Sequence, residues 1–165
     1  MAMALACSDK SRAFWMYDTY EGMTAATDAD LDSKGAKAAA LMQDARRSEV
    51  REQSLVLAYA SLEDVKANMA RTQYPGVRFV AGPVEQTIPG QMPEQIALLR
   101  IDTDWYESTK HELKYLYPRL SVGGILIIDD YGHWQGARKA VDEYFKDSGP
   151  FLNRIDYTGR LMVKQ

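Results

Sequence analysis

The sequence predicts a doubly wound α/β fold that ends in an antiparallel hairpin. Short apolar runs that stop on acidic residues alternate with segments of helical periodicity, and the clearest runs are residues 96–101 and 125–128. Alternating strands and helices of this kind build a mostly parallel sheet covered by helices. Two extended segments, 151–157 and 160–164, flank a Thr-Gly turn and predict the terminal hairpin.

Length and composition predict one domain over residues 1–165. The chain has 165 residues, is 46% hydrophobic, and carries a net charge of −3 without a basic stripe. This excludes nucleic acid as an expected partner. Cys7 is the single cysteine, so no disulfide framework is expected. No apolar run reaches membrane-spanning length and no signal peptide is recognised, so we expect a cytoplasmic protein without membrane contact.

The first half of the chain contains two predicted strands and two predicted helical regions. Residues 13–18 are aromatic and apolar and predict a strand. Residues 25–52 are rich in alanine and charge, which predicts a solvated helix or a mobile cover. Residues 61–64 have the form of a capping box, so a helix should begin there and end near residues 74–76. Residues 77–81 predict the second strand.

Two apolar stripes in the second half predict helices that cover the sheet. The first stripe has the spacing i, i+3, i+4, i+7, and Gly123-Gly124 should end its helix before the strand at 125–128. Its members are Leu113, Leu116, Tyr117 and Leu120. The second stripe should end at Gly149-Pro150, and it comprises Ala137, Ala140, Val141, Tyr144 and Phe145.

Four aspartates follow the two clearest strands. Asp102 and Asp104 come after residues 96–101, and Asp129 and Asp130 come after residues 125–128. Ligands of open α/β sheets bind outside the carboxyl ends of the strands, so these side chains should share one site. Four clustered carboxylates repel each other unless a cation offsets them, and Mg²⁺ prefers oxygen ligands. Caps for the following helices are the simpler alternative, but two pairs on consecutive strands favour a metal.

Three other polar residues carry weaker predictions. Asp18 ends the first strand, where it could accept hydrogen bonds from ribose hydroxyls or serve only as a loop or cap residue. His133 follows the second aspartate pair and either lines the site or is a satisfied loop histidine. His111 is expected on the surface of a helix.

The motifs that contain the aspartates closely resemble the macrocin O-methyltransferase (TylF-type) family. The resemblance includes Leu-Arg-Ile-Asp-Thr-Asp-Trp-Tyr-Glu-Ser-Thr at 99–109 and Ile-Ile-Asp-Asp-Tyr-Gly at 127–132. It also includes segments 17–23 and 77–82, and it covers nearly the whole chain. Members of this family methylate sugar hydroxyls of macrolides and related natural products.

The resemblance implies a Rossmann-like class I fold, S-adenosylmethionine as methyl donor, a small glycosylated substrate and a requirement for Mg²⁺. It assigns Asp102, Asp129 and Asp130 to the metal and Asp104 to the role of general base. The chemistry is consistent, because a cation lowers the pKa of a sugar hydroxyl while a carboxylate removes its proton.

The resemblance also implies a cofactor site at the first two strands. Asp18 would contact the cofactor ribose. The turn formed by Gly82, Pro83, Val84 and Glu85 would lie beside the adenine.

One part of the family pattern is missing from this sequence. None of the eleven glycines forms a glycine-rich turn after a first strand. In family terms the chain begins within the first helix, so the central strand, the glycine-rich turn and an N-terminal lid are expected to be absent. Residues 54–59 could substitute for that strand, or a second copy could pair with the exposed edges in a homo-oligomer.

Two alternative functions compete with the methyltransferase interpretation. The first is an incomplete methyltransferase-like domain that binds a ligand or partner without turnover. The second is a phosphotransferase of the haloacid-dehalogenase type, whose motif begins like Asp102-Thr103-Asp104. That motif expects a threonine two positions after Asp104, where this chain has Tyr106.

Overall fold

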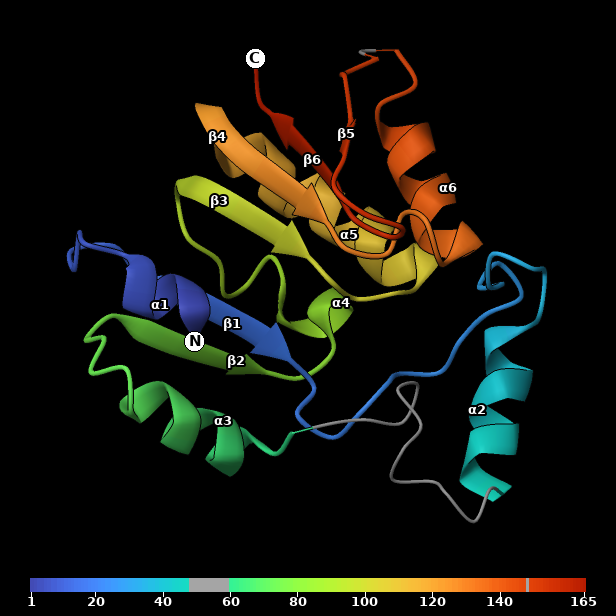
Figure 1. Cartoon of the computed structure of the whole chain (residues 1–165), viewed down its shortest axis with the longest axis horizontal. Coiled ribbons are helices and arrows are strands. Elements are labelled where there is room, and N and C mark those ends of the chain that lie inside the picture. Colours follow the sequence, from blue (N-terminus) through green and yellow to red (C-terminus); the bar gives the residue numbers. More distant parts are fainter. Residues whose placement is uncertain (48–59, 148) are drawn as a thin grey trace.

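The computed structural model describes residues 1–47, 60–147 and 149–165 (Figure 1). No helix in these ranges is both long enough and apolar enough to cross a lipid bilayer. The elements in chain order are α1 (Ala2–Ala6), β1 (Phe14–Asp18), α2 (Ala38–Arg47), α3 (Leu62–Ala70), β2 (Val77–Ala81), α4 (Val84–Thr87), β3 (Ile96–Ile101), α5 (Tyr106–Leu116), the 3₁₀ turn η3 (Tyr117–Arg119), β4 (Leu120–Ile128), α6 (Gln135–Tyr144), β5 (Asn153–Arg154) and β6 (Arg160–Val163).

The strands form two sheets. β1 and β2 pair in parallel, and the second sheet has the order β3-β4-β6-β5. β3 and β4 are parallel, whereas β4–β6 and β5–β6 are antiparallel. The arrowheads of β1, β2, β3 and β4 point the same way in Figure 1. The predicted α/β fold with a terminal antiparallel hairpin is therefore confirmed, and the hairpin strands are shorter than predicted.

The sheet is divided between β1 and β3, because no described ladder joins these two strands. In β1 the backbone groups of Asp18 point towards β2, so the backbone groups of Tyr17 point to the other edge of β1. β3 turns the carbonyl of Ile101 towards β4, so the backbone groups of Arg100 face away from it. The division agrees with the expected absence of a central strand. Residues 54–59, the predicted substitute, lie outside the described residues, and pairing with a second copy stays a prediction.

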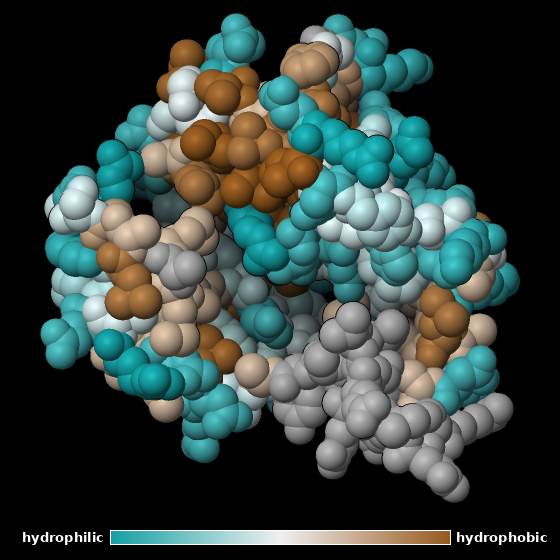
Figure 2. Space-filling view, viewed as in Figure 1, coloured by the Kyte–Doolittle hydropathy of each residue, from teal (hydrophilic) through white to brown (hydrophobic). Residues whose placement is uncertain are grey.

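One face of the four-stranded sheet packs against α5 and α6 and forms a core cluster. Leu113 on α5, Leu126 on β4 and Val141 on α6 are fully buried in it. The opposite face is more open: the side chains of Leu98 on β3 and Val163 on β6 are 40% and 46% exposed. Figure 2 shows hydrophobic surface over these strands.

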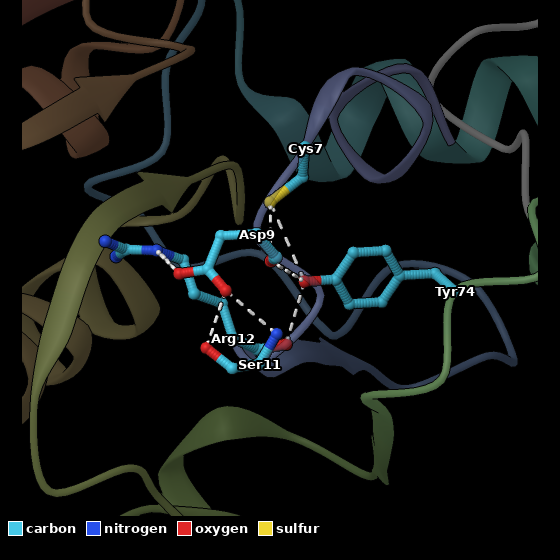
Figure 3. Close-up of polar contacts among 5 residues, drawn as sticks. All are labelled: Cys7, Asp9, Ser11, Arg12 and Tyr74. Atoms are coloured by element: carbon cyan, nitrogen blue, oxygen red, sulfur yellow. Dashed lines mark hydrogen bonds and ion pairs between the residues drawn. The ribbon is translucent and has the colours of Figure 1, made fainter.

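A separate polar cluster fastens the N-terminal segment to the start of β2 (Figure 3). The Tyr74 hydroxyl lies 2.9 Å from the carbonyl oxygens of both Asp9 and Arg12, and 3.7 Å from Cys7 Sγ. The Asp9 carboxylate accepts hydrogen bonds from Ser11 and pairs with the Arg12 guanidinium. These contacts hold the chain that leads into β1.

The predicted helix through Leu120 is wrong. α5 ends at Leu116, Pro118 lies in the 3₁₀ turn, and β4 already begins at Leu120 and includes the glycine pair. The glycine pair is part of β4 and does not end a helix. The Gly123 amide donates to the carbonyl of Lys164, the residue that follows β6, at 2.8 Å. Gly123 has a φ of +78°, which glycine adopts without strain.

Three smaller expectations also needed correction. Within the predicted helical region 25–52, the described helix is only Ala38–Arg47, because the preceding residues form a loop around the buried Asp30. The turn after β2 continues into the short helix α4. Tyr144, predicted on the buried stripe of α6, is 37% exposed. The helix that begins after Ser61 is confirmed, and Ser61 Oγ accepts the Asp64 amide as its cap.

Replacing Leu113 by alanine should destabilise the fold strongly. The side chain is fully buried between the sheet and α6, and removing it leaves a cavity that costs about 2–5 kcal/mol. The free energy of unfolding in urea measures this. Val122→Ala, at a residue 78% exposed, is the control and should change stability by less than about 0.5 kcal/mol. Equal losses in both variants would contradict the described core.

Candidate active site

The two aspartate pairs meet at the carboxyl ends of β3 and β4. Ile101 pairs with Ile128 in the parallel ladder, so the residues that follow each strand emerge side by side. Asp102, Asp129 and Asp130 each offer one carboxylate oxygen, and these oxygens all lie within 4.8 Å of one another. The structure thus brings together the three predicted metal ligands.

Asp104, the predicted base, lies in a tight turn next to this group. Its φ is +64°, and the Trp105 amide donates to the Thr103 carbonyl at 2.7 Å. The Asp104 carboxyl faces that of Asp130 within hydrogen-bond reach. A left-handed conformation at a residue other than glycine stores strain, and such strain is common at functional sites.

The aspartates do not cap the helices that follow them. The N-cap residues of α5 and α6 are Trp105 and Trp134, and the side chains of these two residues make no cap hydrogen bond. The simpler alternative that these acids are helix caps is therefore wrong. Their carboxylates are available for another role.

Burial and the neighbouring carboxyl groups raise the pKa values of Asp102, Asp104 and Asp130. Burial raises the pKa of Asp102 to about 7, and the hydrogen bond with Asp129 adds to the rise. Burial also raises the pKa of Asp130 to about 8, with a further contribution from Asp104. The pKa of Asp104 is raised by burial as well. A bound cation would reverse these shifts by stabilising the charged forms.

Arg100 supplies a positive charge that sequence reasoning missed. Its guanidinium lies 2.7 Å from Asp102 Oδ2 and 3.0 Å from Asp129 Oδ1. The side chain is 44% exposed, so it neutralises the cluster from the solvent side. Its position two residues before Asp102 was the available signal, because residues i and i+2 of an extended chain point to the same face of the sheet.

The donor set fits Mg²⁺. Carboxylate oxygens are the ligands that hard divalent cations prefer. Asp130 Oδ2 is buried and has no hydrogen-bond partner, although buried polar atoms are nearly always paired. One arginine also leaves most of the charge of four acids uncompensated. Asp102, Asp129 and Asp130 are the residues that would hold the ion.

The four predicted cofactor residues gather at the carboxyl ends of β1 and β2. Asp18 pairs with Ala81 in the ladder, and its carbonyl accepts the Gly82 amide at 3.0 Å. Its exposed carboxylate accepts the Tyr20 amide at 2.7 Å. Val84 is buried in the core cluster at the start of α4, whereas the neighbouring Glu85 is exposed. A contact of Asp18, Gly82, Val84 or Glu85 with a cofactor stays a prediction.

Two hydrogen bonds connect the part of the fold that carries the predicted cofactor residues to the part that carries the aspartate cluster. The Tyr17 hydroxyl on β1 donates to the Gln91 carbonyl, in the segment that leads into β3, at 2.9 Å. His111 Nε2 on α5 lies 2.9 Å from the carbonyl of Ile88, directly after α4. His111 is therefore half-buried between elements rather than on the surface as predicted.

An open groove of about 600 Å³ lies along α6 and the segment that follows Asp130, and none of the four aspartates is part of its wall. Tyr131 and His133, which follow Asp130 in the chain, are part of its wall. His133 Nδ1 lies 3.4 Å from the Tyr157 hydroxyl, which in turn lies 2.8 Å from Ser33 Oγ. His133 is thus a partnered loop histidine that also lines the groove.

Glu112 on α5 is another residue near the site that sequence reasoning missed. It is buried, and Thr103 Oγ1, between Asp102 and Asp104, donates to its carboxyl at 2.8 Å. Burial raises the pKa of Glu112 to about 8. The available signal was its spacing of four residues from the buried Leu116, which places it on the inner side of the helix.

Comparison with solved structures identifies the class of protein. The chain matches the structure of the O-methyltransferase NovP with a TM-score of 0.72 and 31% identity, over 93% of this chain and 60% of that one. The calicheamicin methyltransferase CalS11 matches with a TM-score of 0.66 at 18% identity, over 94% of this chain and 62% of that one, which supports the fold alone. The fold is that of an O-methyltransferase.

Sequence comparison identifies the family. The family model for macrocin-O-methyltransferase (TylF) matches residues 1–164. The 8-demethyl-8-(2,3-dimethoxy-alpha-L-rhamnosyl)-tetracenomycin-C 4'-O-methyltransferase of Streptomyces olivaceus is 37% identical over 96% of this chain and 57% of its own length. The mycinamicin III 3''-O-methyltransferase of Micromonospora griseorubida is 34% identical over 82% of this chain and 50% of its own. The chain belongs to the macrocin-O-methyltransferase family and spans about half the length of these relatives.

The pH dependence of stability should reveal the buried Glu112. Its pKa is about 8 in the folded chain against an ordinary value of 4.5. Its contribution to stability is therefore complete below pH 4.5 and is lost as the pH rises to 8, by at most about 1.4 kcal/mol per pH unit. Glu112→Gln stays neutral and should lack this loss. The measurement is the free energy of unfolding against pH, and parallel profiles for both proteins would contradict the assignment.

Proposed function

We propose that the chain forms part of an S-adenosylmethionine-dependent O-methyltransferase that acts on a sugar hydroxyl of a glycosylated natural product with the help of Mg²⁺. The observation that carries the proposal is the convergence of Asp102, Asp129 and Asp130 beside Asp104 in a chain of this family. The names of the Streptomyces olivaceus and Micromonospora griseorubida relatives describe O-methylation of glycosylated compounds.

In the proposed reaction, Asp104 accepts the proton of the sugar hydroxyl while that oxygen attacks the methyl group of the donor. The bond between sulfur and this methyl group breaks, and S-adenosylhomocysteine leaves with the electron pair. Mg²⁺, when bound, supplies positive charge that lowers the pKa of the hydroxyl. Asp102, Asp129 and Asp130 hold that charge in place and orient the acceptor. Burial of Asp104 raises its pKa, which makes its carboxylate a stronger base once ionised. Methyl transfer otherwise requires in-line positioning of donor and acceptor.

The donor is proposed to bind outside the carboxyl ends of β1 and β2, with Asp18 on its ribose and Gly82, Val84 and Glu85 near its adenine. An acid at the end of an early strand is suited to accept from ribose hydroxyls. The groove lined by Tyr131 and His133 would then receive the rest of the acceptor, because Tyr131 follows Asp130 directly in the chain. A cytoplasmic location and a homo-oligomer belong to this proposal as predictions.

The family match favours methyl transfer over the phosphotransferase alternative, because it covers the Asp102-Thr103-Asp104 motif together with nearly all of the chain. Binding without turnover is kept as the competing function. The specific observation in its favour is the divided sheet, in which β1 and β3 each have one edge without a described strand partner.

Calorimetric titration with S-adenosylmethionine tests the proposed function. We expect the chain to bind the donor, and Mg²⁺ to bind with or without it. Because Asp18 is proposed on the ribose, Asp18→Asn should weaken donor binding by about tenfold, while Mg²⁺ binding stays unchanged. Metal binding without donor binding would support the incomplete domain instead.

A matched pair of aspartate variants separates the metal from the base. Asp129→Asn should lose Mn²⁺ binding, because it removes one of the three clustered oxygens. Asp104→Asn should keep Mn²⁺ affinity and lower the rate constant for methyl transfer by about 10²–10⁴-fold. Mn²⁺ paramagnetic resonance and single-turnover assays measure the two effects, and Asp44→Asn, at an exposed position on α2, is the control. Unchanged methylation by Asp104→Asn would show that the base is another group.

A further inference from the structure

Asp30 is a buried acid at the meeting point of three helices. Its side chain is fully buried, and none of the ion pairs among the described residues includes it. Its Oδ2 accepts hydrogen bonds from the Thr27 amide and hydroxyl, both at 2.7 Å. Its Oδ1 accepts the Tyr106 amide at 2.8 Å. A buried carboxylate normally requires strong compensation, and here neutral donors provide it.

The contact with Tyr106 is a helix cap supplied from a distant segment. Tyr106 is the first residue of α5, and the helix lacks a side-chain cap of its own. An acid at a helix N-terminus satisfies a free amide and interacts favourably with the helix dipole. Tyr106 follows Asp104 by two residues, so the contact also fixes one end of the strained turn that carries Asp104.

The loop around Asp30 also contacts the start of α6. An added Cβ at Gly136, in the first turn of α6, would overlap Asp30 Oδ1 and come within 3.2 Å of Tyr106. The Gln135 amide donates to the Leu31 carbonyl at 2.8 Å. The loop around Asp30 therefore touches the start of both helices that follow the aspartate pairs.

The packing of two tryptophans reinforces this arrangement. Trp105 and Trp134, the N-cap residues of α5 and α6, are buried with ring centroids 5.1 Å apart. The Trp105 indole donates to the Thr24 carbonyl at 3.2 Å. Both connections from an aspartate pair to its helix are thus packed beneath the same loop.

We propose that Asp30 is a positioning residue that holds the turn of Asp104, and with it the aspartate cluster, in the geometry needed for metal binding and proton removal. It touches neither metal nor substrate and acts through the Tyr106 amide. This inference rests on the proposed function for its catalytic consequence, whereas its effect on the turn does not depend on that function. Groups that orient the ligands of a metal commonly change affinity or activity by about 10–100-fold.

Two variants disturb the contact in different ways. Asp30→Asn keeps the shape of the side chain but places an amide NH₂ against either Tyr106 or Thr27, so the Tyr106 amide or both Thr27 donors lose their acceptor. Gly136→Ala keeps the carboxylate and pushes it from the Tyr106 amide. Alanine is the better helix former, so a loss in this variant comes from the overlap and not from helix propensity.

Two controls separate positioning from a general loss of stability. Met42→Ala removes a buried side chain from the cluster that contains Trp105 and Trp134 and should lower the melting temperature without touching Asp30. Asp28→Asn removes an acid of the same loop that pairs only with the exposed Lys37 among the described residues.

The readouts are hydrogen exchange of residues 102–109 in the metal-free chain and the Kd for Mn²⁺. We expect faster exchange and a Kd about tenfold higher in Asp30→Asn and Gly136→Ala, with both unchanged in the two controls. Equal effects in Met42→Ala, or unchanged exchange in Gly136→Ala, would overturn the proposal. If Asp30→Asn does not fold, Gly136→Ala decides by the same two readouts.

The experiment distinguishes failure of this inference from failure of the proposed function. A wild-type chain that binds no Mn²⁺ contradicts the metal site, while faster exchange in the two variants alone would still support the role of Asp30. A wild-type chain that binds Mn²⁺ while neither variant changes affinity or exchange would retain the metal site and reject Asp30 as a positioning residue.

Discussion

The parallel pairing of β3 with β4 is the constraint on which the rest of the site depends. Because Ile101 pairs with Ile128, the two aspartate pairs leave the sheet together and their carboxylates converge. Burial raises the pKa of Asp102 and of Asp130, and the neighbouring carboxyl groups add to the rise. The surrounding structure offsets part of the repulsion through the Arg100 guanidinium. A bound cation, as in the proposed metal site, would complete the compensation.

The other half of the proposed site depends on a weaker connection. β1 and β2 form their own sheet, and the described contacts that relate them to β3 run through α4 and through the bond from Tyr17 to the Gln91 carbonyl. Backbone groups at the facing edges of β1 and β3 lack a described strand partner, and unpaired edges are costly or invite pairing. The acid cluster is therefore built within one sheet, whereas the proposed donor site depends on how two sheets are held relative to each other.

Local patterns predicted the strands that carry the site. Residues 77–81 and 96–101 were expected as strands with the observed bounds, because apolar runs between turn residues are short-range signals. The expectation failed at Leu120, where pairing with Ile96 of β3 outweighs the helical spacing. Asp30 was missed for a different reason: a single acid in a charged segment gives no sign that tertiary packing will bury it.

The sequence by itself determined the fold class, the family resemblance and the place of the four aspartates at strand ends, because these follow from apolar runs and motifs a few residues long. Only the tertiary structure decided which oxygens converge, that Arg100 bridges two of them, and that Asp30 reaches Tyr106 across 76 positions in the chain. Such contacts depend on how distant elements pack, and the pattern within any one segment carries no information about its distant neighbours. The missing motif predicted the division between β1 and β3, but only the assembled sheets show which strand edges lack a described partner.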